Sequence, residues 1–212
     1  GVNMAGFCII DDAACREASN QEIIRRYYQA LNRLATEEGS QEEVYKIELL
    51  MKKDKITPSM RQVVGACSTL AAARNAPAAA MELPDGRIIT GKTGSLLGAS
   101  AAVLLNAIKE LGEIPHDVHL IAPSAIEPIQ TLKTNYLGSK NPRLHTDEVL
   151  IALSVSAATD PIAQKAMAQL PKLDGCQVHT SVMLSSVDIS IFKKLGVQLT
   201  SEPVYEHKRL YR

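Results

Sequence analysis

The sequence predicts an α/β protein in which a helical segment precedes a layered domain with a mixed or partly parallel sheet. Three observations support this fold class. Strand-like runs alternate with helical periodicity over residues 76–212, as in helices packed on a sheet. Two apolar runs flank Pro84-Asp85-Gly86, a strong turn signal for a hairpin. Before residue 76 the apolar residues recur at helical spacing. We therefore predict a helical segment over 1–75 and an α/β domain over 76–212.

Three helices are expected in the first segment. Ser19-Asn20-Gln21-Glu22 is a capping box, in which a hydroxyl and a carboxylate satisfy free backbone N–H groups, so a helix is predicted from there to Gly39. Ser40-Gln41-Glu42-Glu43 repeats this pattern and predicts a second helix. Thr57-Pro58 predicts a third, running towards Arg74, because a proline in the first turn loses no hydrogen bond.

The second segment is expected to alternate between strands and helices. Apolar runs bounded by turn residues predict strands at residues 78–83, 87–90, 117–122, 177–183 and 197–200. Helical spacing and caps predict helices at residues 95–111, 124–138, 146–158, 160–171 and 186–195.

Composition excludes several classes of protein. The 212 residues include 23 Lys and Arg against 23 Asp and Glu, no Trp and two Phe. Neutral charge and few aromatic residues argue against nucleic acid as a partner, because such binders are basic and stack bases on aromatic rings. No apolar run approaches the roughly 18 residues of a membrane span. We find no secretory signal pattern, and the cysteines have no zinc-type spacing, so we expect reduced thiols in a cytoplasmic protein. The cysteines are Cys8, Cys15, Cys67 and Cys176.

Residues 86–93 match the letters of a phosphate loop, G-x-x-x-x-G-K-[ST]. The context differs from such a loop, because Gly86 completes a hairpin turn and residues 87–90 form a predicted strand whose N–H groups pair in the sheet. The predicted strand at 117–122 also lacks an acidic end for Mg²⁺. The match therefore does not indicate a nucleoside triphosphate site.

A simpler anion site is predicted at the turn between this strand and the next helix. A helix N-terminus presents free N–H groups and partial positive charge, which attract anions. Lys92 adds a charge, Thr93 and Ser95 add hydroxyls, and Gly91 and Gly94 permit close backbone approach. The loop at residues 140–143 is a further candidate for binding the same anion. The alternative interpretation is an ordinary turn with Ser95 as the N-cap.

A weaker candidate for a metal site stands at the start of the helix predicted from Thr146. His145, Asp147 and Glu148 lie close enough in sequence to bind a metal ion or to transfer protons. The alternative is that Thr146 caps the helix, with the two acids in its first turn where the helix dipole favours negative charge.

Five stretches carry a resemblance to a known family. They are GVNMAGFCIIDD at residues 1–12, QEIIRRYY at 21–28, GKTGSLLGASA at 91–101, YLGSKNPRLHTDEVL at 136–150 and GVQLTSEPVY at 196–205. The chain resembles the bacterial domain-of-unknown-function family 1846, also called uncharacterised protein family 0371, along its whole length.

The resemblance implies the C-terminal portion of a longer, cytosolic bacterial protein that oligomerises. Family members are about twice this long or more, so the helical segment would continue from a preceding N-terminal part. The resemblance implies no established reaction, although some relatives carry labels such as ATP-dependent peptidase. A glycine-rich, phosphate-loop-like segment in that N-terminal part would place a nucleotide site there.

Three functions follow as hypotheses. The first is assembly, because alanine-rich helices pack closely. The partners would be further copies of the chain, in a homo-oligomer, and the N-terminal part of the same parent protein. The second is a half-site for a phosphorylated or otherwise anionic small molecule at residues 91–95. The third is a metal-dependent hydrolase that uses His145, Asp147 and Glu148. No catalytic residue and no cofactor is identified by the sequence.

Overall fold

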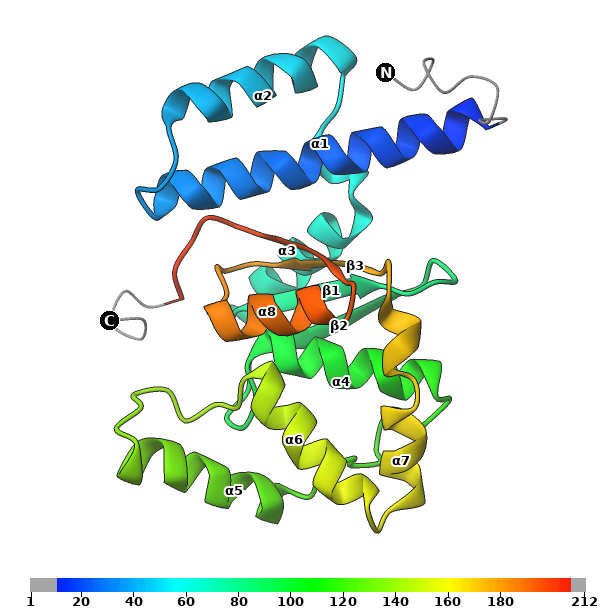
Figure 1. Cartoon of the computed structure of the whole chain (residues 1–212), viewed down its shortest axis with the longest axis vertical. Coiled ribbons are helices and arrows are strands. Elements are labelled where there is room, and N and C mark those ends of the chain that lie inside the picture. Colours follow the sequence, from blue (N-terminus) through cyan, green and yellow to red (C-terminus); the bar gives the residue numbers. More distant parts are fainter. Residues whose placement is uncertain (1–10, 207–212) are drawn as a thin grey trace. The chain divides into compact units, whose positions relative to one another are not determined.

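The computed structural model describes residues 11–206 and divides the chain into two units, Gly1–Gln62 and Val63–Arg212 (Figure 1). The domain boundary predicted after residue 75 stays a prediction. Cys8 lies outside the described residues. The described cysteines, Cys15, Cys67 and Cys176, are free thiols. No helix in the described part of the chain is both long and apolar enough to cross a membrane.

The first unit contains two long helices, α1 (Asp12–Ala35) and α2 (Gln41–Asp54). The start predicted for α1 at Ser19 is wrong, because Asp11 caps the helix and accepts a hydrogen bond from the backbone N–H of Ala14. Ser19 lies inside the helix and donates to the carbonyl of Cys15. The start of α2 is confirmed, since the hydroxyl of Ser40 accepts from the N–H of Glu43 at 3.2 Å.

The third predicted helix is two elements. Pro58 opens only a 3₁₀ turn, η2 (Pro58–Met60), and α3 (Gln62–Arg74) follows it. Arg61 separates the two, because its extended backbone (φ −90°, ψ 97°) cannot continue a helix.

The second unit holds a four-stranded mixed sheet among the described residues, in the order β2-β1-β3-β4. Its strands are β1 (Ala78–Glu82), β2 (Ile88–Lys92), β3 (Gln177–Thr180) and β4 (Gln198–Ser201). The predicted hairpin is confirmed: β1 pairs antiparallel with β2, and Gly86 adopts the positive φ (83°) that the turn requires. β1 also pairs antiparallel with β3, and β3 pairs parallel with β4. The prediction of a mixed α/β sheet is therefore correct.

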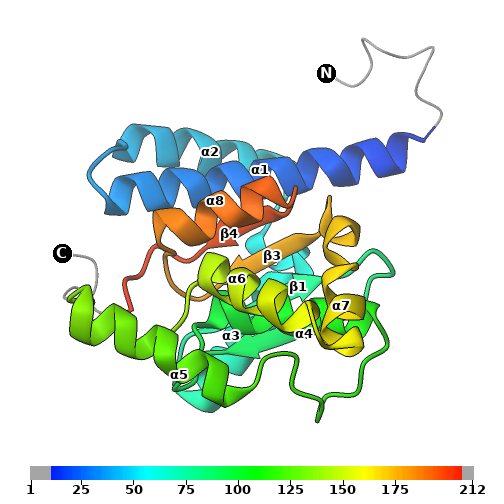
Figure 2. The same ribbon diagram turned by 60° about the horizontal axis from the view of Figure 1, so that its bottom comes forward.

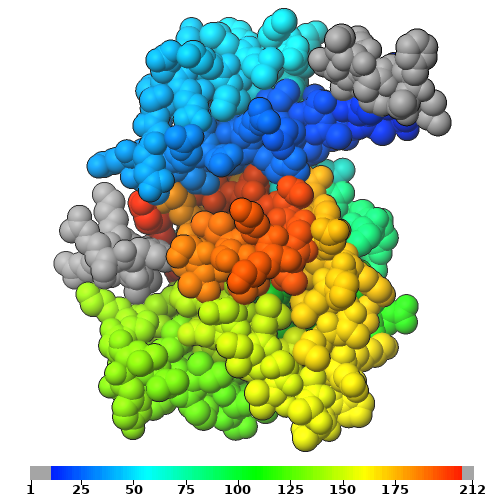
Figure 3. Space-filling view, viewed as in Figure 1, coloured from blue at the N-terminus to red at the C-terminus, as the bar shows by residue number. Residues whose placement is uncertain are grey.

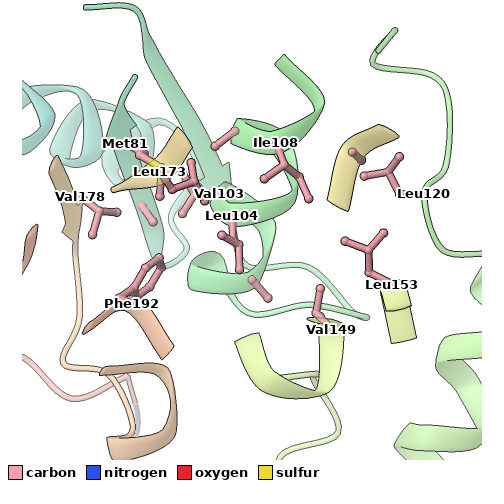
Figure 4. Close-up of a cluster of buried hydrophobic side chains, with 14 of the residues drawn as sticks. Met81, Val103, Leu104, Ile108, Leu120, Val149, Leu153, Leu173, Val178 and Phe192 are labelled. Carbon is pink, nitrogen blue, oxygen red and sulfur yellow. The ribbon is translucent and has the colours of Figure 1, made fainter. Parts of the chain in front are cut away.

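Alternate residues of β1 serve the two faces of the sheet. Ala78 and Ala80 pack with Val63 and Cys67 of α3 on one face. Ala79 and Met81 point into the larger core on the other face (Figure 4). This core is covered by α4 (Ala99–Leu111), α6 (Thr146–Ala157), α7 (Pro161–Met167) and α8 (Ser186–Lys194) (Figure 2).

The strand predicted at residues 117–122 is wrong. The buried ammonium of Lys109 bonds the carbonyls of His116 and Val118 at 2.7 and 2.6 Å, so a side chain satisfies backbone groups that a neighbouring strand would otherwise pair. Leu120 and Ile121 are nevertheless buried, which explains the apolar pattern of this loop. The loop leads into α5 (Pro123–Thr131) and a π-helical turn, η3 (Leu132–Tyr136).

Candidate functional site

The predicted anion-binding turn does not lie at a helix N-terminus. Gly91 and Lys92 are the last residues of β2, and α4 begins only at Ala99, with Gly98 as its N-cap. Neither a helix-dipole site at this turn nor an N-cap at Ser95 is therefore present. Gly91 packs directly against α4, because a Cβ atom at this position would stand 2.3 Å from the backbone nitrogen of Val103. This glycine lets the strand and the helix pack closely.

The backbone of the turn is already hydrogen-bonded at two positions. The N–H of Thr93 donates to the carbonyl of Pro77 at 2.8 Å, and the N–H of Gly94 donates to the carbonyl of Leu97 at 3.0 Å. A ligand at this turn would therefore meet side chains rather than these two amides. Thr93, Gly94 and Ser95 do line a pocket, whereas Gly91 and Lys92 are not among the residues that line it.

We call this hollow, of about 610 Å³, the strand-end pocket. Its volume lies within the range of small-molecule sites. Its wall is formed by Asn75, Ala76, Pro77, Thr93, Gly94, Ser95, Arg143, Val182, Val204, Tyr205 and Glu206. Three of these segments directly follow β2, β3 and β4, so the pocket opens at the carboxyl ends of these strands. Ligands of open α/β sheets bind outside such strand ends.

Arg143 is the cation of the pocket. Its Nη1 lies 2.5 Å from Oε1 of Glu206, and the two side chains are 30% and 13% exposed. The loop that carries Arg143 is fixed to the loop after β2, because Leu144 donates to the carbonyl of Leu96 at 2.9 Å. The structure thus brings the predicted 140–143 loop together with three of the five predicted turn residues.

The opposite wall is the segment after β4. Val204 accepts a hydrogen bond from the N–H of Met183 at 2.8 Å, which holds this segment beside the end of β3. Val182, Val204 and Tyr205 make this side largely apolar, while Thr93, Ser95 and Asn75 supply hydroxyl and amide groups. Among the described residues, the lining therefore combines one cation, a few polar groups and an apolar wall. This mixture suits a small organic molecule that carries an acid.

Two of the three predicted metal candidates at the start of α6, His145 and Glu148, are engaged in other contacts, whereas the buried Oδ1 of Asp147 has no hydrogen-bond partner in the described part of the chain. His145, rather than Thr146, is the N-cap of α6. Its Nδ1 lies 3.0 Å from Oδ2 of Asp188, and its backbone N–H donates to Oε2 of Glu148 at 2.8 Å. That carboxylate oxygen also accepts from Nζ of the buried Lys133 at 2.7 Å. Among residues 11–206, no three His, Cys, Asp or Glu side chains gather where a metal ion could bind.

Asp188 is the residue that the sequence reasoning missed. It is 3% exposed and accepts from the N–H and hydroxyl of Thr146, each at 2.9 Å, and from the hydroxyl of Ser185. Burial alone would raise the pKa of Asp188, but the hydrogen bonds from His145 and Thr146 hold it below its ordinary value. The same bond to Asp188 raises the pKa of His145. Ser185 and Asp188 have capping-box spacing, which is the sequence signal for this cluster.

The buried cysteines are poor nucleophiles. Burial raises the pKa of the Cys67 thiol to about 12, and it also raises the pKa of Cys176. Both therefore stay protonated at neutral pH and serve packing.

Comparison with known proteins identifies relatives along the whole chain. The model "Domain of unknown function DUF1846, C-terminal" matches residues 59–211, and "Domain of unknown function DUF1846, N-terminal" matches residues 1–55. A UPF0371 protein of Corynebacterium glutamicum is 54% identical over all 212 residues. Similar proteins of Corynebacterium diphtheriae and Streptococcus pyogenes are 55% and 49% identical over the same length. In each case the chain covers 43% of the relative's own length.

Proposed function

The chain belongs to the family of unknown function DUF1846, and we propose that its second unit binds a small molecule bearing a carboxylate or phosphate in the strand-end pocket. One observation supports this proposal above the others. Arg143 and the polar side chains of Thr93 and Ser95 converge on one hollow at the ends of three strands. A guanidinium binds planar acids through paired hydrogen bonds, and hydroxyls complete such a site.

Glu206 has a defined part in this proposal. It occupies Arg143 when no ligand is bound, which avoids leaving a partly buried cation without a counter-charge. An incoming acid would replace the carboxylate of Glu206 at the same guanidinium. The molecule's remaining surface would contact Val182, Val204 and Tyr205.

The test is a thermal-shift and calorimetry panel on the intact chain with inorganic phosphate, succinate and adenosine monophosphate. We expect at least one probe to raise the melting temperature of the wild type and to lose this effect in Arg143→Gln. Arg87→Gln is the matched control, because Arg87 pairs with Asp85 and Glu110 and does not line the pocket. Equal stabilisation of wild type and Arg143→Gln, or none by any probe, contradicts the proposal.

A second candidate function is assembly, which exposed apolar side chains on α6 and α7 support. Ile151 and Val155 stand one helical turn apart on α6 and are 63% and 69% exposed, and Ile162 of α7 is 42% exposed. Both helices lie at the molecular surface (Figure 3). Large apolar side chains that are exposed in this way can form an interaction site when they lie together. The proposed homo-oligomer would bury it.

Sedimentation of the purified chain tests this role. We expect a concentration-dependent oligomer that Ile151→Glu shifts to monomer, while Lys165→Glu on α7 leaves it unchanged. A strict monomer at high concentration contradicts it. A cytoplasmic location and the metal-dependent hydrolase stay predictions.

A further inference from the structure

The first unit carries a groove between its two long helices, with a volume of about 490 Å³. Ala18 and Ile23 of α1 and Ile47 and Leu50 of α2 form its apolar lining. Glu22 and Arg26, an ion pair at 2.8 Å, stand at its edge. We call it the α1–α2 groove.

The groove is lined by residues of these helices other than those that are fully buried. Ile24 and Tyr28 of α1 and Val44 and Met51 of α2 are already buried. The groove residue Leu50 remains 41% exposed, and the neighbouring Leu49 is 49% exposed. A helix normally buries its apolar stripe against another element, so a helix pair with a second open stripe lacks a packing partner.

The family comparison indicates what that partner is. The N-terminal family model matches residues 1–55, which include both helices, whereas the C-terminal model matches residues 59–211. The relatives are more than twice as long as this chain, which covers 43% of them. The two helices therefore match the N-terminal domain of the family, and the relatives contain further chain beyond the part that matches.

We propose that the α1–α2 groove is the docking surface for the rest of the N-terminal domain of the longer family protein. Its chemistry defines the occupant as an apolar face of a helix or strand that fills the space between Ile23 and Leu50. Polar groups at the border of that face would meet Glu22 and Arg26. This inference is independent of the strand-end pocket, because every groove residue belongs to the first unit.

The experiment places the same substitution in two contexts. Leu50→Glu is made in this chain and at the aligned position of the full-length Corynebacterium diphtheriae relative. In this chain the exposed side chain tolerates a charge, so we expect the unfolding midpoint to move by no more than about 1 °C. In the full-length protein the charge would be buried, and we expect a fall of about 3–6 °C.

Two controls keep the result decisive. Lys53→Glu adds a carboxylate to an exposed position of α2 outside the groove, and it should be silent in both contexts. Leu50→Ala is the milder variant if the charged full-length protein does not fold, and it should lower that midpoint by about 2–4 °C. Silence of both Leu50 variants in the full-length protein overturns the proposal. So does a dimer of this chain that Leu50→Glu dissociates, because a second copy would then be the occupant.

Discussion

Two ion pairs flank Leu144, and they differ in how firmly each is held. Arg143 pairs with Glu206, and both side chains are partly exposed. His145 pairs with Asp188, whose carboxylate is 4% exposed and accepts three further hydrogen bonds from Thr146 and Ser185. The first pair lines a pocket, whereas the second joins the starts of α6 and α8.

Under the proposed function, the difference separates a structural ion pair from an exchangeable one. Removing Asp188 leaves several buried donors without an acceptor, which costs far more than a single bond contributes. Removing Glu206 leaves the partly buried guanidinium of Arg143 without its counter-charge, but its 30% exposure gives water or a ligand some access to it. Because Arg143 keeps access to water, we expect this pair to contribute less to stability than the contacts of Asp188, and the proposed function takes it to be replaceable by a ligand acid.

The largest expected effect is that of Asp188→Ala. We expect the free energy of unfolding to fall by about 3 kcal/mol, because the buried N–H and hydroxyl of Thr146 lose their acceptor and His145 loses its counter-charge. Urea titration followed by circular dichroism measures it. Asp160→Ala is the matched control, since Asp160 caps α7 through a bond to Ile162 and its loss should cost only about 1 kcal/mol. Equal losses in the two variants would mean that the buried contacts of Asp188 contribute no more to stability than a single helix cap.

The sequence predicts the cap chemistry of several helices and the hairpin, because these depend on neighbouring residues. Ser40 and Gly86 act as their local patterns predict. At the strand expected at 117–122, Lys109 of α4 instead bonds the carbonyls of His116 and Val118, a contact that the local pattern does not contain. The pairing of His145 with Asp188 spans 43 residues and depends on how α6 and α8 pack. No local pattern contains that information.

The candidate site likewise has features that neighbouring residues indicate and features that depend on residues far apart in the sequence. Thr93, Gly94 and Ser95 of the predicted turn and Arg143 of the predicted 140–143 loop line a common pocket, and their role in binding an anion stays a prediction. The sequence places Gly91 in the ligand site because glycine permits close approach, and the approach is instead made by α4. It also gives no sign that Glu206 would reach Arg143, 63 residues away.

A change of pH is expected to have a smaller effect on the free energy of unfolding. This effect tests only the pair of His145 and Asp188. The pKa of His145 is raised in the folded state, so its contribution to stability is complete below the ordinary histidine pKa and is lost as the pH rises through the raised value. The pKa of Asp188 is lowered, so its contribution is present above the ordinary aspartate pKa and is lost as the pH falls through the lowered value. We expect wild type to lose stability relative to His145→Gln as the pH rises from 6 to 9. If the stabilities of wild type and His145→Gln change in parallel with pH, the positive charge of His145 does not contribute to stability.

The smallest effect on stability, with a gain in binding, is expected from Glu206→Gln. Because Glu206 makes a single partly exposed ion pair with Arg143, its neutral isostere should change the free energy of unfolding by no more than about 1 kcal/mol. The same change removes the carboxylate that competes with a ligand acid, so the probe that binds wild type should bind about fivefold more tightly, the equivalent of about 1 kcal/mol. Titration calorimetry and urea unfolding on the same preparation measure both quantities. If Glu206→Gln instead weakens binding, the carboxylate of Glu206 is part of the ligand site. The ligand would then place a cationic group, rather than an acidic group, beside Glu206. If Glu206→Gln destabilises the fold as much as Asp188→Ala, both ion pairs are structural and the pocket has no exchangeable cation.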